Sequence, residues 1–282
     1  MISKLNKVTL LTDPRTQKDR ARIYPVLRRV KSELDSLGVA WQDTKGIDLE
    51  ELVPDPDSDL FLVIGGDGTM IHFAGHLSKY GLPYFGLNYG NVGFMMNPAR
   101  KFLSKTLHAL RDGKYTVGDF PLLEIVGTDC QGNVHSGLGL NDVFIQRMTP
   151  QACKIEVEIG GEELAFSPIL CDGIILSTPL GSTAYAYSVT RSIVAVDVPV
   201  IAFTPIAANR NFPARNILFP IDTRFSFKVL EPVKRKVQMV NDSFSLGNLT
   251  EAEVFLSKTK VQLCFLNEPD QSLAMRCINK MS

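Results

Sequence analysis

Several features that would assign this chain to a familiar class of protein are missing. No apolar run approaches the ~18 residues that a transmembrane helix needs, and no long apolar segment follows the first residues as in a secretion signal. The five cysteines are scattered and include no C-x-x-C pair. This distribution argues against a disulfide framework or a zinc site and favours reduced thiols. We therefore expect a cytoplasmic protein that is not associated with a membrane.

The sequence also lacks a charge imbalance. Lys and Arg total 30, Asp and Glu total 30, and the formal net charge is zero. A nucleic-acid partner is not expected, because the overall positive field is absent and any anionic ligand needs a local site. No G-x-x-x-x-G-K-[ST] loop, protein-kinase H-R-D set or G-x-G-x-x-G after a strand occurs. These absences argue against common ATPases, protein kinases and NAD-dependent dehydrogenases.

The first third of the chain alternates between strand and helix patterns. Apolar residues recur at helical spacing from Ile23 to Leu37, with Gly38 as a C-cap, and Pro25 suggests that this helix begins near residue 25. Ser104 is expected to cap a later helix. The other expected elements are strands at 7–12, 60–64 and 83–87 and helices from about 70 and over 104–111. This rhythm predicts a parallel sheet covered by helices.

Beyond about residue 118, short β-rich runs separated by turn signals dominate, with one helix expected after Gly181. The fold class is therefore α/β plus all-β, with an N-terminal Rossmann-like α/β domain and a C-terminal β-rich domain. We expect domains at 1–117 and 118–255, and a tail at 256–282 that returns to the first domain. A strand at 261–266 and a short helix at 272–280 are expected in this tail.

The sequence Gly65-Gly66-Asp67-Gly68-Thr69 lies between a buried strand and a helix. Its glycines allow a ligand close to the backbone, and a helix N-terminus favours phosphate. A carboxylate beside phosphate is unfavourable unless Mg²⁺ is present or the carboxylate accepts a proton from a hydroxyl. Asp67 is therefore the candidate catalytic residue, although it can also simply cap the helix.

Two further segments carry polar residues suited to a ligand. The segment 171–185 ends a strand at Thr178-Pro179 and opens a helix near Thr183, and Tyr185 offers a flat ring for a base. Asn141 and Asp142 can bind ribose hydroxyls or form an Asx-turn. Each feature also has an ordinary structural use.

Taken in order, these motifs resemble the NAD kinase family over 60–242. The motifs are GGDGT at 65–69, NYGNVGF at 88–94, Asn141-Asp142, Asp172-Gly173 and STPLGSTAY at 177–185. The Cys-Asp-Gly context at 171–173 and VLEPVKR at 229–235 resemble an alphaproteobacterial-type branch.

The resemblance implies an enzyme that phosphorylates the adenosine 2′-hydroxyl of NAD to give NADP. ATP or polyphosphate is the donor, the cofactor is Mg²⁺ carried by the triphosphate, and the protein is a homodimer or homotetramer. Asp67 is implied as the proton acceptor. The expected NAD or nucleotide contacts are Gly66, Asp67, Gly68, Asn141, Asp142, Asp172, Thr183, Ala184, Tyr185 and Ser188.

Three further candidates are weaker. His72 follows the glycine loop closely enough to approach phosphate, and Lys154 can neutralise one. Asp242 ends the stretch 60–242 that resembles the family, and Asp242-Ser243 replaces a more typical Asp-Gly or Asp-His. The chain also has Asp142 where many members have Glu, Leu180 at a position that is usually small, and VTRS at 189–192.

Two alternative functions remain open. A diacylglycerol-type lipid kinase shares the GGDGT loop and a following β domain, but the sequence shows no apolar entry or basic membrane face. The departures suggest a non-catalytic NAD(P)-binding sensor, against which the retained Asp67 argues.

Overall fold

A computed structural model describes residues 5–13, 17–91, 93–209, 212, 215–242 and 244–266. The helix expected at 272–280 and Cys277 lie outside these residues. Within the described chain, no helix is both long and apolar enough to cross a membrane. The chain forms two compact units, which we describe separately. Unit 1 holds the described residues up to Phe120 and from Lys260, and unit 2 is Pro121–Thr259.

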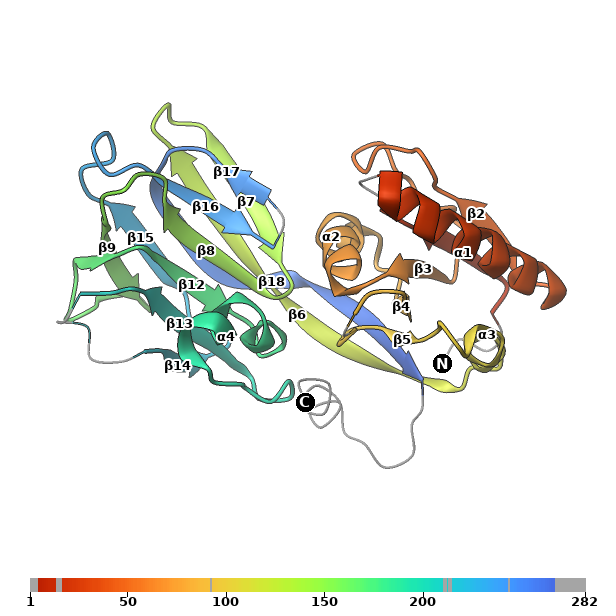
Figure 1. Ribbon diagram of the computed structural model, residues 1–282. Helices are drawn as coiled ribbons and strands as arrows, with labels where there is room; N and C mark the ends of the chain where they lie inside the picture. Colours follow the sequence, from red (N-terminus) through yellow and green to blue (C-terminus); the bar gives the residue numbers. More distant parts are fainter. Residues whose placement is uncertain are drawn as a thin grey trace. The chain divides into compact units, whose positions relative to one another are not determined.

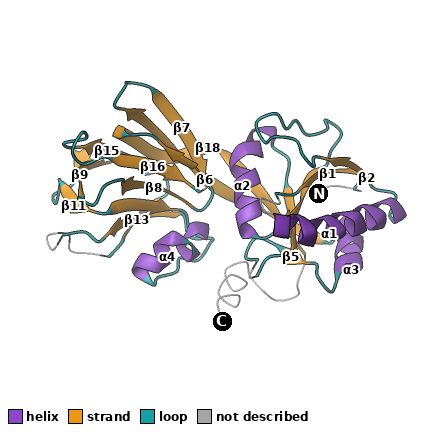
Figure 2. Cartoon of the chain, turned by 45° about the horizontal axis from the view of Figure 1, so that its top comes forward, coloured by secondary structure: helices purple, strands orange, loops and turns teal. Residues whose placement is uncertain are grey.

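Unit 1 is a parallel sheet with helices on both faces (Figures 1 and 2). Its strands pair in the order β2-β1-β3-β4, and β5 and the end of β18 also pair with β4 in parallel. The predicted Rossmann-like α/β class is thus confirmed. Its elements are β1 (Lys7–Leu11), α1 (Gln17–Ser36), β2 (Ala40–Asp43), β3 (Leu60–Gly65), α2 (Asp67–Leu77), the 3-10 helix η1 (Ser78–Tyr80), β4 (Tyr84–Asn88), β5 (Asn97–Pro98) and α3 (Leu103–Arg111).

The core of unit 1 explains why these segments form helices and strands. Residues of α1 and α3 at helical spacing, including Leu27 and Leu107, pack on one face of the sheet with Leu62. On the opposite face Gly86 leaves room for α2, since a Cβ there would lie 2.9 Å from Cε of Met70. β3 is buried over its whole length, as its continuous apolar run predicts.

Two helix boundaries differ from the expectation. α1 begins at Gln17, and Pro25 lies inside it. Pro25 is exposed, so the carbonyl that loses its backbone partner can bond to water. α3 begins at Leu103, and its N-cap residue is Phe102 without a side-chain cap, so Ser104 lies within the first turn.

Unit 2 is built of antiparallel strands (Figure 1). The chain enters it along β6 and leaves it along β18. Its strands are β6 (Tyr115–Asp129), β7 (Val134–Gly139), β8 (Asp142–Arg147), β9 (Cys153–Ile159), β10 (Glu162–Glu163), β11 (Ile169–Cys171), β12 (Gly173–Ser177), β13 (Val200–Ile206), β14 (Ile217–Pro220), β15 (Phe225–Val229), β16 (Val237–Asn241), β17 (Phe244–Leu246) and β18 (Leu249–Leu266). The 3-10 helix η2 (Leu180–Thr183) and α4 (Tyr185–Thr190) follow β12.

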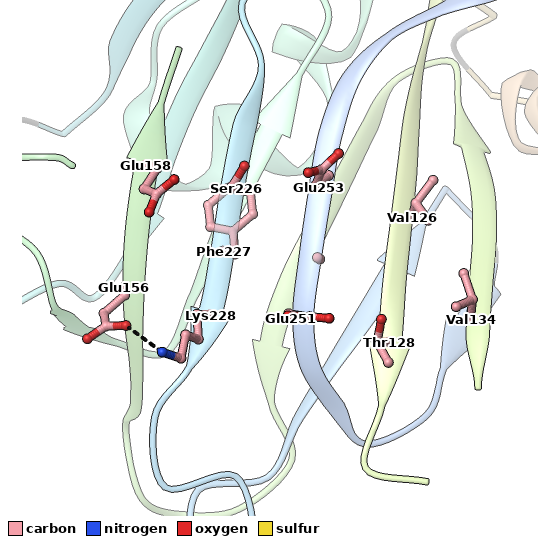
Figure 3. Close-up of a pocket in the computed structure, with 11 residues that line it drawn as sticks. Val126, Thr128, Val134, Glu156, Glu158, Ser226, Phe227, Lys228, Glu251 and Glu253 are labelled. Carbon is pink, nitrogen blue, oxygen red and sulfur yellow. Dashed lines mark ion pairs between the residues drawn. The ribbon is translucent and has the colours of Figure 1, made fainter. Parts of the chain in front are cut away.

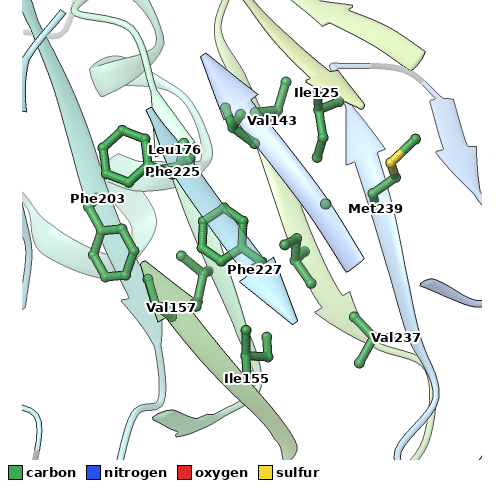
Figure 4. Packing of buried hydrophobic residues seen from close by; sticks show 14 of the residues in the cluster. Ile125, Val143, Ile155, Val157, Leu176, Phe203, Phe225, Phe227, Val237 and Met239 are labelled. Carbon is green, nitrogen blue, oxygen red and sulfur yellow. The ribbon is translucent and has the colours of Figure 1, made fainter. Parts of the chain in front are cut away.

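Two layers of strands enclose the core of unit 2. One has the order β14-β13-β12-β8-β16-β17, and the other contains β9, β15, β18, β6 and β7. Side chains of both layers meet in a single cluster, in which Phe203 stacks on Phe225 with ring centroids 6.0 Å apart (Figure 4). The predicted β-rich class is confirmed. The boundary expected at residue 255 falls inside the 18-residue strand β18.

Candidate active site

The glycine loop of unit 1 joins two of the predicted motifs. The N–H groups of Tyr89 and Gly90 both donate to the carbonyl of Gly65, at 2.6 and 3.1 Å. Gly66 and Gly90 pack against each other, since a Cβ on Gly90 would lie 2.8 Å from Cα of Gly66. This close approach requires glycine at both positions. The GGDGT and NYGNVGF motifs therefore form one local structure.

The Asp67 carboxylate is held by the second of these motifs. Its two oxygens accept hydrogen bonds from the N–H groups of Phe94 and Met95, each at 2.8 Å. A carboxylate has about four lone-pair sites, so each oxygen keeps capacity for a further donor. The residue therefore orders the loop and still has an acceptor for a ligand hydroxyl. The alternative in which Asp67 simply caps α2 is not seen, because the N-cap residue of that helix is Gly66, without a side-chain bond.

A cavity of about 340 Å³ lies beside the glycine loop. Gly66 and Gly68 line it together with Asp13, Asp19 and Arg22. The N-terminus of α2 opens at this loop, and such termini bind phosphate. The cavity therefore combines a helix N-terminus suited to phosphate with the side chains of one arginine and two aspartates.

His72 lies on α2, and its Nε2 is 3.8 Å from the Asp13 carboxylate. His72 therefore lies next to the glycine-loop cavity, because its partner Asp13 lines that cavity. Among the described residues, no group of three or more His, Cys, Asp or Glu side chains is arranged to hold a metal ion.

In unit 2 the Asn141-Asp142 motif lies at the start of β8, of which Asp142 is the first residue, and it contacts the helical segment after β12. Asp142 is buried, and the backbone N–H of Tyr185 lies near enough to its carboxylate to favour the charged form. Burial, followed by the nearby charge of Asp242, raises the pKa of Asp142 to about 7. Oδ1 of Asn141 is buried and has no hydrogen-bond partner among the described residues. Since a buried acceptor without a partner is unfavourable, this atom is suited to a ligand donor.

The STPLGSTAY segment packs closely on this turn. A Cβ on Gly181 would lie 1.9 Å from the carbonyl oxygen of Asn141, so only glycine fits. Thr183 ends η2 and Ala184 links it to α4. Ser188 lies on α4 and is exposed.

Tyr185 and Asp172 line one cavity of about 470 Å³. The Tyr185 ring meets Phe144 edge to face, with centroids 5.3 Å apart. Asp172 follows β11 and forms an ion pair with Arg147, whose Nε is 2.6 Å from Oδ1. A second guanidinium nitrogen of Arg147 bonds to Oδ2 at 3.2 Å, so the pair is bidentate. Sequence reasoning missed Arg147, because nothing in the local pattern at the end of β8 indicates this partner.

The two remaining candidates have protein partners. Nζ of Lys154 is 3.8 Å from the Glu231 carboxylate, and Lys154 does not line the cavity of Tyr185. The Asp242 carboxylate accepts hydrogen bonds from backbone amides of the Asn141 turn.

A separate groove of about 490 Å³ crosses the face of the sheet formed by β9, β15, β18, β6 and β7 (Figure 3). Glu156, Glu158, Glu251 and Glu253 give it an acidic lining, and Lys228 pairs with Glu156 at 3.6 Å. None of the predicted site residues lines this groove.

An α/β unit with a glycine loop at a helix N-terminus and a β unit with a polar cavity lined by an aromatic ring are the features of a nucleotide-binding protein. The ATP-NAD kinase N-terminal domain matches residues 26–115, and the ATP-NAD kinase C-terminal domain matches residues 140–248. The chain belongs to the ATP-NAD kinase family.

Sequence relatives support this assignment, and two solved structures share the fold. An NAD kinase of Rhizobium meliloti (strain 1021) is 32% identical over 92% of this chain and 97% of its own length. One of Caulobacter vibrioides is 32% identical over 70% of this chain and 74% of its own length. Yeast NADH kinase complexed with NADH has a TM-score of 0.80 at 22% identity, covering 99% of this chain and 87% of the other. An NAD kinase from Archaeoglobus fulgidus in complex with ATP has a TM-score of 0.74 at 20% identity, covering 98% and 97%.

Proposed function

We propose that this protein is an NAD kinase that transfers a phosphoryl group from ATP to the adenosine 2′-hydroxyl of NAD. The observation that carries the proposal is the gathering of Asp142, Asp172 and Tyr185 in unit 2. These residues are distant in sequence, yet the backbone N–H of Tyr185 lies near the Asp142 carboxylate, and Tyr185 shares a cavity with Asp172. An aromatic ring beside two carboxylates suits a base and the hydroxyls of its ribose.

Unit 1 supplies the residues for the donor. The amides at the start of α2 and the side chain of Arg22 offer hydrogen bonds and positive charge to phosphate oxygens in the glycine-loop cavity. Phosphoryl transfer depends on such positioning more than on covalent chemistry. We assign this cavity to the donor phosphates, and polyphosphate is the alternative donor.

Asp67 is proposed as the general base. Its two bonds to Phe94 and Met95 fix the direction of the carboxylate, and the remaining lone pairs can accept the ribose proton. The proton of a ribose hydroxyl must leave as the bond to phosphorus forms, and a positioned carboxylate accepts it.

Mg²⁺ is proposed as the cofactor. Carboxylates of Asp13 and Asp19 line the donor cavity and are the type of ligand that Mg²⁺ prefers, so the residues present fit the ion. The triphosphate would carry the ion, and Asp13 and Asp19 are the carboxylates that would hold it. When bound, it neutralises charge on the transferring group.

A coupled assay tests the proposal. NADP⁺ formation is followed from NAD⁺, ATP and Mg²⁺ with an NADP⁺-specific dehydrogenase, and EDTA and polyphosphate are used in parallel reactions. We expect NADP⁺ with ATP and its loss with EDTA. Binding of NAD⁺ without turnover would favour the sensor function instead, and transfer of labelled phosphate to diacylglycerol without an NAD⁺ thermal shift would favour the lipid kinase.

We also propose a cytoplasmic homodimer or homotetramer. The family resemblance supports the oligomer, and the free thiols of Cys130, Cys153, Cys171 and Cys264 support the cytoplasmic assignment. Light scattering after size exclusion is expected to give two or four times the 31.2 kDa chain mass. A monomer at micromolar concentration would contradict the oligomer assignment.

A further inference from the structure

Asp242 occupies a backbone conformation that favours glycine. It follows β16 in the turn to β17 and has a φ of 38°. A residue with a Cβ is disfavoured there, and Asp is tolerated better than most. The position therefore retains a carboxylate although glycine would be the less strained choice.

The carboxylate of Asp242 binds three successive backbone amides, those of Leu140 and Asn141 in the turn before β8 and that of Asp142, the first residue of β8. Oδ2 accepts from the N–H of Leu140 at 2.6 Å. Oδ1 accepts from the N–H groups of Asn141 at 3.2 Å and Asp142 at 3.3 Å. The Asp242 N–H in turn donates to the carbonyl of Asp142 at 3.3 Å. Consecutive amides converging on one anion form a backbone nest, whose occupant here is a side chain of the same chain.

The opposite side of the same turn is held by Thr178. Its hydroxyl donates to the carbonyl of Leu140 at 2.8 Å, and its backbone N–H donates to that of Asn141 at 2.9 Å. The backbone of the turn is thus fixed through both its amides and its carbonyls. Oδ1 of Asn141, which has no partner among the described residues, therefore belongs to a residue whose backbone N–H and carbonyl are both hydrogen-bonded.

We propose that Asp242 is a positioning residue of the acceptor site, an inference that rests on the proposed function. Its carboxylate holds the backbone of Leu140–Asp142 so that the side chains of Asn141 and Asp142 face the ribose of NAD. This role replaces the direct nucleotide contact expected from the sequence, because the oxygens of Asp242 are engaged by the turn. Burial of the carboxyl raises its pKa to about 6, so the group is ionised at neutral pH and can act as the anion of the nest.

Asp242→Gly is the test variant, since glycine adopts the observed φ without strain and removes only the carboxylate. Asp242→Asn is the second variant, because it keeps one acceptor oxygen and the size of the side chain. Asp129→Asn is the matched control. Oδ1 of Asp129 also accepts two backbone amides, those of Gln131 and Asn133, but in the turn between β6 and β7.

Amide hydrogen exchange of the free proteins and NAD⁺ titration calorimetry are measured together. In Asp242→Gly we expect exchange at Leu140–Asp142 and the NAD⁺ dissociation constant each to rise by about tenfold or more, the scale of a lost charged hydrogen bond. The KM for ATP should stay within about twofold, because the donor residues are those of unit 1. Asp242→Asn should fall between wild type and Asp242→Gly, and Asp129→Asn should change neither quantity.

Three results would overturn the inference. Weaker NAD⁺ binding with unchanged exchange at Leu140–Asp142 would mean that Asp242 contacts the ligand directly. Faster exchange with unchanged affinity would mean that the turn does not position the site. If the wild-type protein forms NADP⁺ and both Asp242 variants do so equally well, the positioning role alone is overturned. A wild-type protein that neither binds NAD⁺ nor forms NADP⁺ would overturn the proposed function.

Discussion

Replacing Asp142 with Asn should make the free protein more stable at neutral and alkaline pH. Asp142 is 4% exposed, and its neighbour Asp242 is also a buried carboxyl. Burial and the charge of Asp242 raise the pKa of Asp142 to about 7. Asn keeps the size of the side chain and an oxygen for the Tyr185 N–H, and it carries no charge to desolvate.

The magnitude follows from the difference between the folded and unfolded states. An unfolded Asp titrates near pH 4, about three pH units below the folded group, and each unit corresponds to about 1.4 kcal/mol. Because the folded pKa is raised, the stability contributed by the protonated form is complete below about pH 4 and is lost as the pH rises to about 7. Roughly a third of this contribution to the free energy of unfolding is already lost at pH 5. The stability difference between Asp142→Asn and wild type should therefore grow by about 2–3 kcal/mol between pH 5 and pH 8.

Urea unfolding at several pH values, without ligand, measures this difference. Far-UV circular dichroism is preferred, since the single tryptophan, Trp41, lies in unit 1. Asp222→Asn is the control, because Asp222 is exposed in a turn of unit 2 and should follow the wild-type pH dependence. A constant difference between Asp142→Asn and wild type from pH 5 to pH 8 would refute the argument that Asp142 is buried beside a second carboxyl.

Three further substitutions test the site. Asp67→Asn should lower kcat at least ~10²-fold with the NAD⁺ dissociation constant within several-fold, and a small kcat change would contradict the base assignment. Tyr185→Ala should weaken NAD⁺ binding by roughly 1–2 kcal/mol in calorimetry, whereas Tyr185→Phe should keep most of the affinity; equal losses would indicate a role for the hydroxyl. Gly181→Ala places a methyl group 1.9 Å from the carbonyl oxygen of Asn141. It should therefore lower the free energy of unfolding by about 1–3 kcal/mol and weaken NAD⁺ binding. An unchanged melting temperature would show that the turn can move to accommodate the methyl group.

Local patterns in the sequence determined much of the fold. The apolar run before Gly65 and the glycines after it specify the strand, turn and helix that carry Asp67, because each requirement is met by neighbouring residues. The strand β8 contains the apolar run Val143-Phe144-Ile145, and buried and less buried positions alternate from Val143 to Gln146. The family could also be recognised, because its motifs keep their order along the chain.

Tertiary structure decided what depends on residues far apart in sequence. Asp242 meets the amides of Leu140 and its neighbours about a hundred positions away, and no local pattern distinguishes such an acceptor from a ligand contact. The bidentate partner of Asp172 is Arg147, which becomes its neighbour only when β8 pairs with β12. The sequence by itself proposed candidate side chains for the ligand site. The pairing of strands decided which other side chains hold them in place, because a hydrogen bond between distant segments exists only after the chain has folded.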